Sequence, residues 1–172
     1  MSETLRVGNV DRMGTAQAGA RTRRTPGVVA AVGAAALVVA GGLVAYGAYG
    51  DPSSKADQRS AVPFLIGVSV VLAAVVFGVL VPKGLQALRE AAPHASRWPL
   101  AHGIVGVLLI VVFWSGAPVI LGAAALLLGS EARRDASDRG VSTATATAAV
   151  VLGSIATVLP VVVTILGNTV AH

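Results

Sequence analysis

The sequence predicts an all-α protein whose helices cross a membrane several times, and three observations lead to this fold class. Hydrophobic residues make up 55% of the 172 residues, and charged residues only 12%, about half of the share in soluble domains. The 13 Lys and Arg and the 8 Asp and Glu all lie outside four stretches, at 25–50, 60–82, 98–130 and 140–172. Each stretch is long enough to cross a hydrocarbon core of about 30 Å as a helix. A charge at the centre of such a helix would cost ~2.5–3.5 kcal/mol, so the pattern indicates a bilayer.

The chain divides into a short tail and one transmembrane helical domain at 26–172. Residues 1–25 are polar, carry five arginines and lack hydrophobic periodicity, which predicts a disordered basic cytoplasmic tail. Pro26 suits the first turn of a helix. The first predicted span, 28–49, is about 33 Å long, and its far end carries Tyr46 and Tyr49, as is typical of a membrane interface.

The second predicted span covers 63–81, about 27 Å of helix, and the last covers 144–170. After the second span, Leu85 and Leu88 could form the apolar face of an amphipathic surface helix. A helix end that emerges into water is the favoured interpretation of this segment. Pro160 predicts a kink in the last span.

The third stretch has two interpretations, because thirty helical residues at 100–129 would be about 45 Å long. One is a single kinked span, which gives four spans in all. The other is a short hairpin with arms at 100–114 and 118–130, which turns at Ser115, Gly116 and Pro118. The hairpin leaves eleven Lys and Arg on the cytoplasmic side and two outside, against eight and five for the kinked span. Cytoplasmic loops carry the excess of Lys and Arg, so the hairpin is favoured. It also places Trp114 at the outer interface rather than near the middle of the membrane.

The second half of the chain resembles a known group of proteins. An Ala-Leu run at 124–129 precedes Arg133 and Arg134, and a short polar stretch, Gly140 and the segment 148–153 follow. This pattern, over about 100–167, resembles uncharacterised small integral membrane proteins of actinobacteria. The resemblance implies a hairpin broken by Gly and Pro, a short basic loop and a final helix containing glycine. This chain departs from the pattern, because its loop carries three acids beside its three arginines.

Catalysis and cofactor binding lack candidate residues in this sequence. There is no cysteine, and no His or Asp accompanies the serines at depth in the membrane, so we expect no enzyme, no cofactor and no metal site. The basic residues are spread between the tail and short loops, which is typical of membrane topology and not of nucleic-acid binding. His102 could be a pH-sensing group, but a structural role near the interface is favoured.

Helix association is the best supported function. Small residues spaced by four let helix backbones approach closely in a membrane, and three such pairs occur: Gly41 with Ala45, Ala74 with Gly78, and Ala149 with Gly153. We therefore expect a non-enzymatic structural or accessory component of a bacterial cytoplasmic membrane, with its N-terminus in the cytoplasm. Its partners would be the lipid bilayer and either a second copy or a larger membrane protein. The alternative is a small oligomeric channel or transporter whose pore is lined by Ser115, Thr157, Thr164 and Asn168.

Overall fold

The computed structural model describes residues 26–50, 56–90, 95, 97–139 and 142–170, and the tail predicted at 1–25 lies outside this part of the chain. The described residues form helices and contain no strand. Three helices are long and apolar enough to cross a membrane, and a shorter apolar helix accompanies them. The all-α fold class with three spans and a short hairpin is therefore confirmed.

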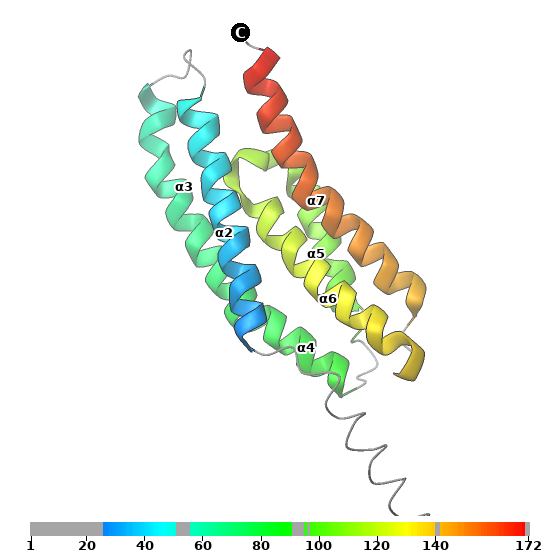
Figure 1. Cartoon of the computed structure of the whole chain (residues 1–172). Helices are drawn as coiled ribbons and strands as arrows, with labels where there is room; N and C mark the ends of the chain where they lie inside the picture. Colours follow the sequence, from blue (N-terminus) through cyan, green and yellow to red (C-terminus); the bar gives the residue numbers. More distant parts are fainter. Residues whose placement is uncertain (1–25, 51–55, 91–94, 96, 140–141, 171–172) are drawn as a thin grey trace, which may run out of the picture.

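The first two long helices, α2 (Pro26–Tyr49) and α3 (Ala56–Val75), lie side by side (Figure 1). One π-helical turn, η1 (Val76–Leu80), joins α3 to α4 (Val81–Arg89). The resulting helix runs without interruption for 34 residues, well beyond the predicted 63–81. A π turn often bends a helix, and Figure 1 shows α4 continuing beneath the end of α6.

The packing of α4 excludes the less favoured interpretation of this segment, an amphipathic surface helix with an interfacial face. Leu85 and Leu88 are 8% and 1% exposed, so they belong to the protein interior and the interfacial face is wrong. The physical reason is the approach of α4 to α6. At Gly84 a built Cβ would lie 3.1 Å from Leu128 of α6, so the absence of a side chain at Gly84 brings the two helices together and covers the leucines.

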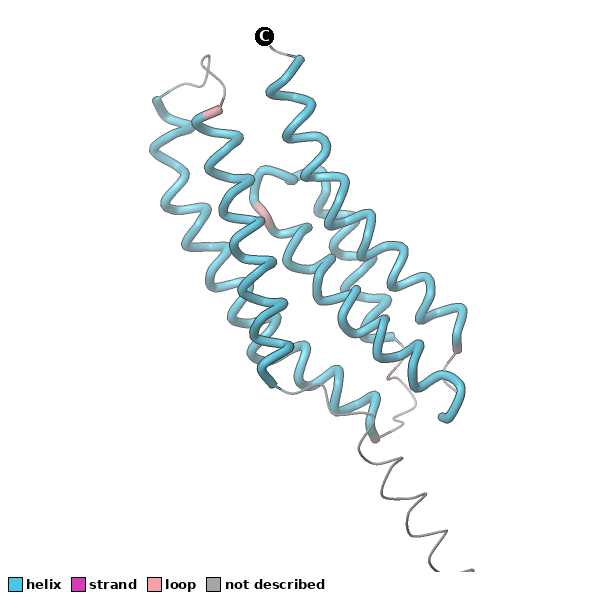
Figure 2. The backbone as a smooth tube through the Cα atoms, in the orientation of Figure 1, coloured by secondary structure: helices cyan, strands magenta, loops and turns pink. Residues whose placement is uncertain are grey.

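The third charge-free stretch forms the hairpin, and the single kinked span is excluded. Its arms are α5 (Arg97–Leu108), which continues as the 3₁₀ turn η2 (Leu109–Ser115), and α6 (Ala117–Arg139). The two arms lie against each other (Figure 2). Helical geometry is interrupted at Val112, with φ −108° and ψ 41°, and the chain reverses at Gly116, which has a φ of 71°. α6 extends past the predicted 130, and Glu131 forms an ion pair with Arg134 at 3.7 Å.

The hairpin turn packs against the middle of α2 and not against its end. A Cβ built on Gly116 would lie 2.8 Å from Cβ of Ala40 in α2. Ala40 precedes the end of α2 by nine residues, or about 14 Å, so the turn stops well short of the end of the bundle. The position of the turn at the outer interface stays a prediction, and the side chain of Trp114 lies outside the described residues.

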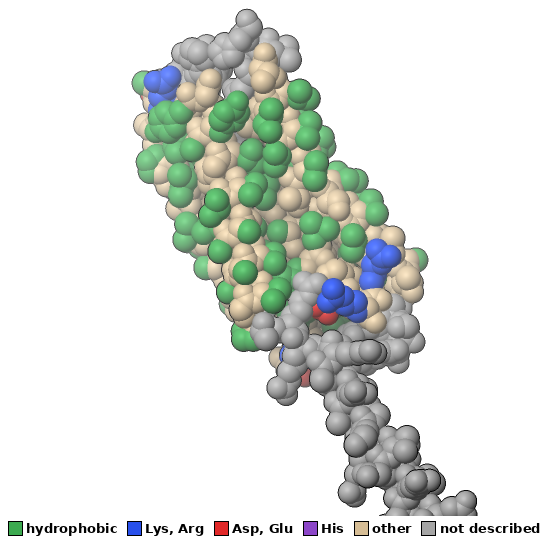
Figure 3. Space-filling model, in the orientation of Figure 1, with side chains coloured by type: hydrophobic (Ala, Val, Ile, Leu, Met, Phe, Trp, Pro, Cys, Tyr) green, Lys and Arg blue, Asp and Glu red, His purple; other side chains and the backbone are tan. Residues whose placement is uncertain are grey.

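The last helix, α7 (Thr143–Val170), packs along both arms of the hairpin. Its final part projects past the hairpin turn (Figure 1), and the large side chains there, including Val162, Ile165 and Leu166, are exposed. Because of the hairpin, the start of α2 and the end of α7 lie at opposite ends of the bundle. In Figure 3 the Lys and Arg side chains lie near the two ends, with hydrophobic side chains between them.

Candidate functional site

The hairpin turn satisfies its own polar groups, as a turn inside a bilayer must. The hydroxyl of Ser115 donates to the carbonyl of Val112 at 2.8 Å and accepts from the amide of Ala117 at 3.3 Å. The amide of Ile120 donates to the carbonyl of Gly116 at 3.4 Å. Pro118 is fully buried and has no amide hydrogen that would need a partner. The three residues predicted for the turn thus lie together, and the turn pairs several of its own polar groups.

Ser69 joins this turn to α3, which the sequence did not predict. Its hydroxyl lies 3.0 Å from the carbonyl of Ser115 and 2.9 Å from the carbonyl of Leu65 in its own helix. The side chain is 1% exposed, and its single hydrogen is shared between two acceptors. The sequence feature that could have predicted this contact is a serine in the middle of an otherwise apolar span. With Gly116 resting on Ala40, the turn is held by both α2 and α3.

The three predicted small-residue pairs fall in different surroundings. Ala149 and Gly153 are buried where α7 meets α6, and a Cβ on Gly153 would lie 2.8 Å from the carbonyl oxygen of Gly122. Gly41 and Gly78 have no atom within 4 Å of a built Cβ, apart from the backbone of their own helices. Of their pair partners, Ala45 is half-buried and Ala74 is exposed. These two pairs therefore do not form close helix contacts within the described residues.

The closest approaches of the hairpin arms and α7 involve glycines that the sequence reasoning missed. A Cβ on Gly122 would lie 2.5 Å from Oγ1 of Thr157 and 2.8 Å from the carbonyl oxygen of Gly153. Gly103, Gly106 and Gly129 are similarly close to α7, with contacts of 3.0–3.1 Å. The spacings of seven (Gly122 and Gly129) and three (Gly103 and Gly106) place each pair on one helix face. That signal was available in the sequence.

The hydroxyls proposed for a pore bond to their own helix instead. Thr157 donates to the carbonyl of Gly153 at 2.8 Å, and Thr164 donates to the carbonyl of Pro160 at 2.7 Å. This i to i−4 bonding is common for hydroxyls in membrane helices. Ser115 is engaged in the turn, and the side chain of Asn168 lies outside the described residues. The described hydroxyls of Ser115, Thr157 and Thr164 therefore each donate within their own segment, and the pore stays a prediction.

His102 is buried beside Trp98 at the start of α5. Its Nδ1 lies 2.8 Å from the carbonyl oxygen of Trp98, so this nitrogen carries the hydrogen and donates it. The two rings are stacked, with centroids 6.1 Å apart. This geometry supports the structural role expected for His102. Among the described residues, no group of three His, Cys, Asp or Glu side chains could hold a metal ion.

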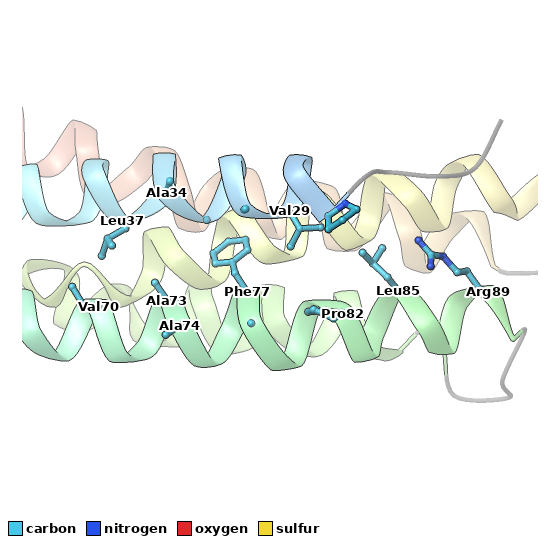
Figure 4. Close-up of a pocket in the computed structure, with 14 residues that line it drawn as sticks. Val29, Ala34, Leu37, Val70, Ala73, Ala74, Phe77, Pro82, Leu85 and Arg89 are labelled. Atoms are coloured by element: carbon cyan, nitrogen blue, oxygen red, sulfur yellow. The ribbon is translucent and has the colours of Figure 1, made fainter. Parts of the chain in front are cut away.

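A groove separates α2 from the helix formed by α3, η1 and α4 (Figure 4). It encloses about 680 Å³. The predicted residues Ala74 and Gly78 line it, and so do Gly33 and Phe77, whose ring lies between the helices. Arg89 lies at one end and is the only charged side chain among the described residues that line the groove.

Comparison of the chain with protein-family models, with curated proteins and with solved structures gives no match. The fold and these sites define the class of the protein, which is a helical membrane protein with three spanning-length helices and a hairpin whose turn is buried between them.

Proposed function

We propose that this protein is a non-enzymatic accessory component of a bacterial cytoplasmic membrane, which acts by contact between one of its helices and another membrane helix. The contact face lies on the second half of α2 and is defined here as the open α2 face: Gly41, Gly42 and Ala45. Its occupant would be a helix of a larger membrane protein or of a second copy.

One observation carries this proposal. Neither glycine of the open α2 face, Gly41 or Gly42, has an atom within 4 Å of a built Cβ beyond its own helix. A glycine inside a helix costs about 0.5–1 kcal/mol relative to alanine. In the hairpin this cost is offset by close helix contact, since Gly103, Gly106, Gly122 and Gly129 all meet atoms of other segments. At the open α2 face no described residue of another segment makes such a contact with a glycine, which favours close approach by another helix.

The experiment is crosslinking in the native membrane followed by pull-down, with Gly42→Leu compared with the unchanged chain. Leucine at 42 meets no described residue of its own chain, so we expect the fold to be kept and the yield of a crosslinked partner to fall about tenfold, equivalent to ~1.4 kcal/mol. Gly67→Leu on α3 is the matched control, because Gly67 is equally open and lies outside the open α2 face. Equal yields for both variants contradict the proposal. Solute flux in liposomes without a captured partner would instead favour the channel or transporter.

For the threading, we propose a multi-pass arrangement in which the N-terminus and the Arg89 end of the bundle are cytoplasmic. Two features support it: the start of α2 and the end of α7 lie at opposite ends, and eleven of thirteen Lys and Arg then lie inside. A compartment reporter fused after His172 should be active outside the cytoplasm. Cytoplasmic activity of this reporter contradicts the arrangement.

A further inference from the structure

The groove between α2 and the α3–η1–α4 helix serves neither the hairpin turn nor the open α2 face. Its lining is apolar except at the end that carries Arg89 (Figure 4). Small side chains, Ala30 and Ala34 on α2 and Ala74 on α3, together with Gly78, keep it open along its length.

Phe77 accounts for the separation of the two helices. The ring is 8% exposed, and a Cβ on Gly33 would lie only 2.8 Å from its Cγ. The aromatic ring therefore fills the space opposite Gly33 and acts as a spacer between the backbones. On either side of the ring the small residues do not fill the gap, which leaves a groove that opens to the lipid side of the bundle.

The length of the groove distinguishes between possible occupants. On α2 it extends from Pro26 to Leu37, about 17 Å of helix, and on the opposite wall its apolar part extends from Val70 to Leu85, about 23 Å. Both lengths are shorter than a hydrocarbon core of about 30 Å. A partner helix would have to cross the whole core, whereas a lipid acyl chain occupies a single leaflet. The dimension therefore favours an acyl chain.

Arg89 determines which lipid fits. It lies in the last turn of α4, and its side chain rises from α4 on the same side as Leu85 (Figure 4). At this end of the bundle a lipid phosphate would lie at the level of the polar headgroups. A guanidinium has five N–H donors and can bind a phosphate by two of them, so Arg89 can bind a headgroup while it keeps other contacts.

We propose that the groove binds one acyl chain of an anionic phospholipid and that the lipid phosphate contacts Arg89. The preference for anionic over zwitterionic lipid comes from the net negative charge of the headgroup, since a zwitterionic lipid carries its own cation beside the phosphate. The lipid site is distinct from the open α2 face. An experiment that contradicts lipid binding in the groove therefore leaves the proposed helix contact untouched, and the reverse also holds.

The test uses the full chain in phosphatidylcholine vesicles that contain a small fraction of a photoactivatable lipid with the reactive group in its acyl chain. The probe is either phosphatidylglycerol or phosphatidylcholine with the same acyl chains. We expect crosslinks at 26–37 and 70–85, and about tenfold more for phosphatidylglycerol, because its headgroup has no cation beside the phosphate to oppose Arg89. Gly78→Leu should strongly reduce labelling by both probes, because it fills the groove. Arg89→Gln should keep the labelling and abolish the preference.

Matched controls separate these effects from damage to the fold. Gly67→Leu adds the same side chain to α3 outside the groove, and Lys83→Gln removes an exposed cation of α4 that does not line it. Both should label like the unchanged chain, and circular dichroism should show equal helix content for all variants. Gly78→Leu itself meets open space, so the variant can fold.

Several results would overturn the proposal. Equal labelling by the two probes excludes the role of Arg89, and labelling that survives Gly78→Leu places the lipid elsewhere. The chain has no cysteine of its own, so a disulfide dimer formed by Gly78→Cys would show that a second copy occupies the groove. Increased labelling after deletion of residues 1–25 would show that the tail occupies it.

Discussion

The hairpin with α7 and the pair formed by α2 and α3 are built from similar Gly- and Ala-rich helices, yet they pack differently. In the first region, Gly122 and Gly153 bring the backbones of α6 and α7 into contact. In the second, the ring of Phe77 opposes Gly33 and a groove remains beside it. The difference shows that small residues produce close packing only where they oppose small residues or backbone on the neighbouring helix.

This contrast also separates two uses of glycine. Position 122 must be glycine because a Cβ there would lie 2.5–3.0 Å from atoms of α7. A Cβ at Gly42, Gly67 or Gly78 has no such neighbour. In the first region an added methyl group must move a backbone, and interiors resist such movement. At Gly42, Gly67 and Gly78 of the second region an added methyl group meets nothing within the described chain. The two regions therefore predict opposite responses to the same substitution.

The largest effect is expected for Gly122→Ala. Its Cβ would lie 2.5 Å from Oγ1 of Thr157 and 2.8 Å from the carbonyl oxygen of Gly153, so α6 and α7 must separate. We expect a loss of about 3 kcal/mol in the free energy of unfolding, measured in mixed micelles by titration with a denaturing detergent. Adding Thr157→Ala should restore only part of the loss, because the carbonyl of Gly153 remains. Full restoration would show that the helices are not in backbone contact.

A smaller effect is expected for Gly116→Ala in the hairpin turn. The φ of 71° costs a residue with a side chain about 1–2 kcal/mol, and the new Cβ would also meet Ala40 at 2.8 Å. We expect a total loss of about 2 kcal/mol by the same titration. Ala40→Gly in the same chain removes the contact but not the backbone strain, so it should recover part of the loss. No loss at all would contradict a turn buried against α2.

The smallest effect is expected for Gly67→Ala on α3. This position has no neighbour within 4 Å beyond its own helix, and alanine is the better helix former. The free energy of unfolding should stay unchanged or rise by up to about 0.5–1 kcal/mol. A loss above ~1 kcal/mol that depends on protein concentration would show that another copy covers this face of α3.

Much of the architecture followed from local sequence features. The apolar stretches predicted the helices because hydrophobic length is a property of consecutive residues. The hairpin followed from the positions of Arg133 and Arg134, together with the break at Gly116 and Pro118. The resemblance to actinobacterial membrane proteins stays a prediction, as do the absence of catalysis and the kink at Pro160.

The candidate sites were less accessible from the sequence. Spacings of four between small residues recur throughout a Gly- and Ala-rich chain, and of the three predicted pairs only Ala149 and Gly153 lie in a close helix contact. Gly122 was missed because its opposing atoms belong to α7, more than thirty positions away in the chain. The part played by Ser69 depends on the height of the hairpin turn, which no local pattern specifies.

The sequence by itself determined the membrane class, the apolar segments and the reversal of the third one, because charge and hydropathy act on each segment separately. Only the tertiary structure decided which glycines touch a neighbour, how deep the turn lies and where a groove remains. These properties depend on the rotation and relative height of packed helices. They arise from contacts between segments that are distant in the chain, with Phe77 against Gly33 and Gly122 against Gly153 as the two contrasting cases.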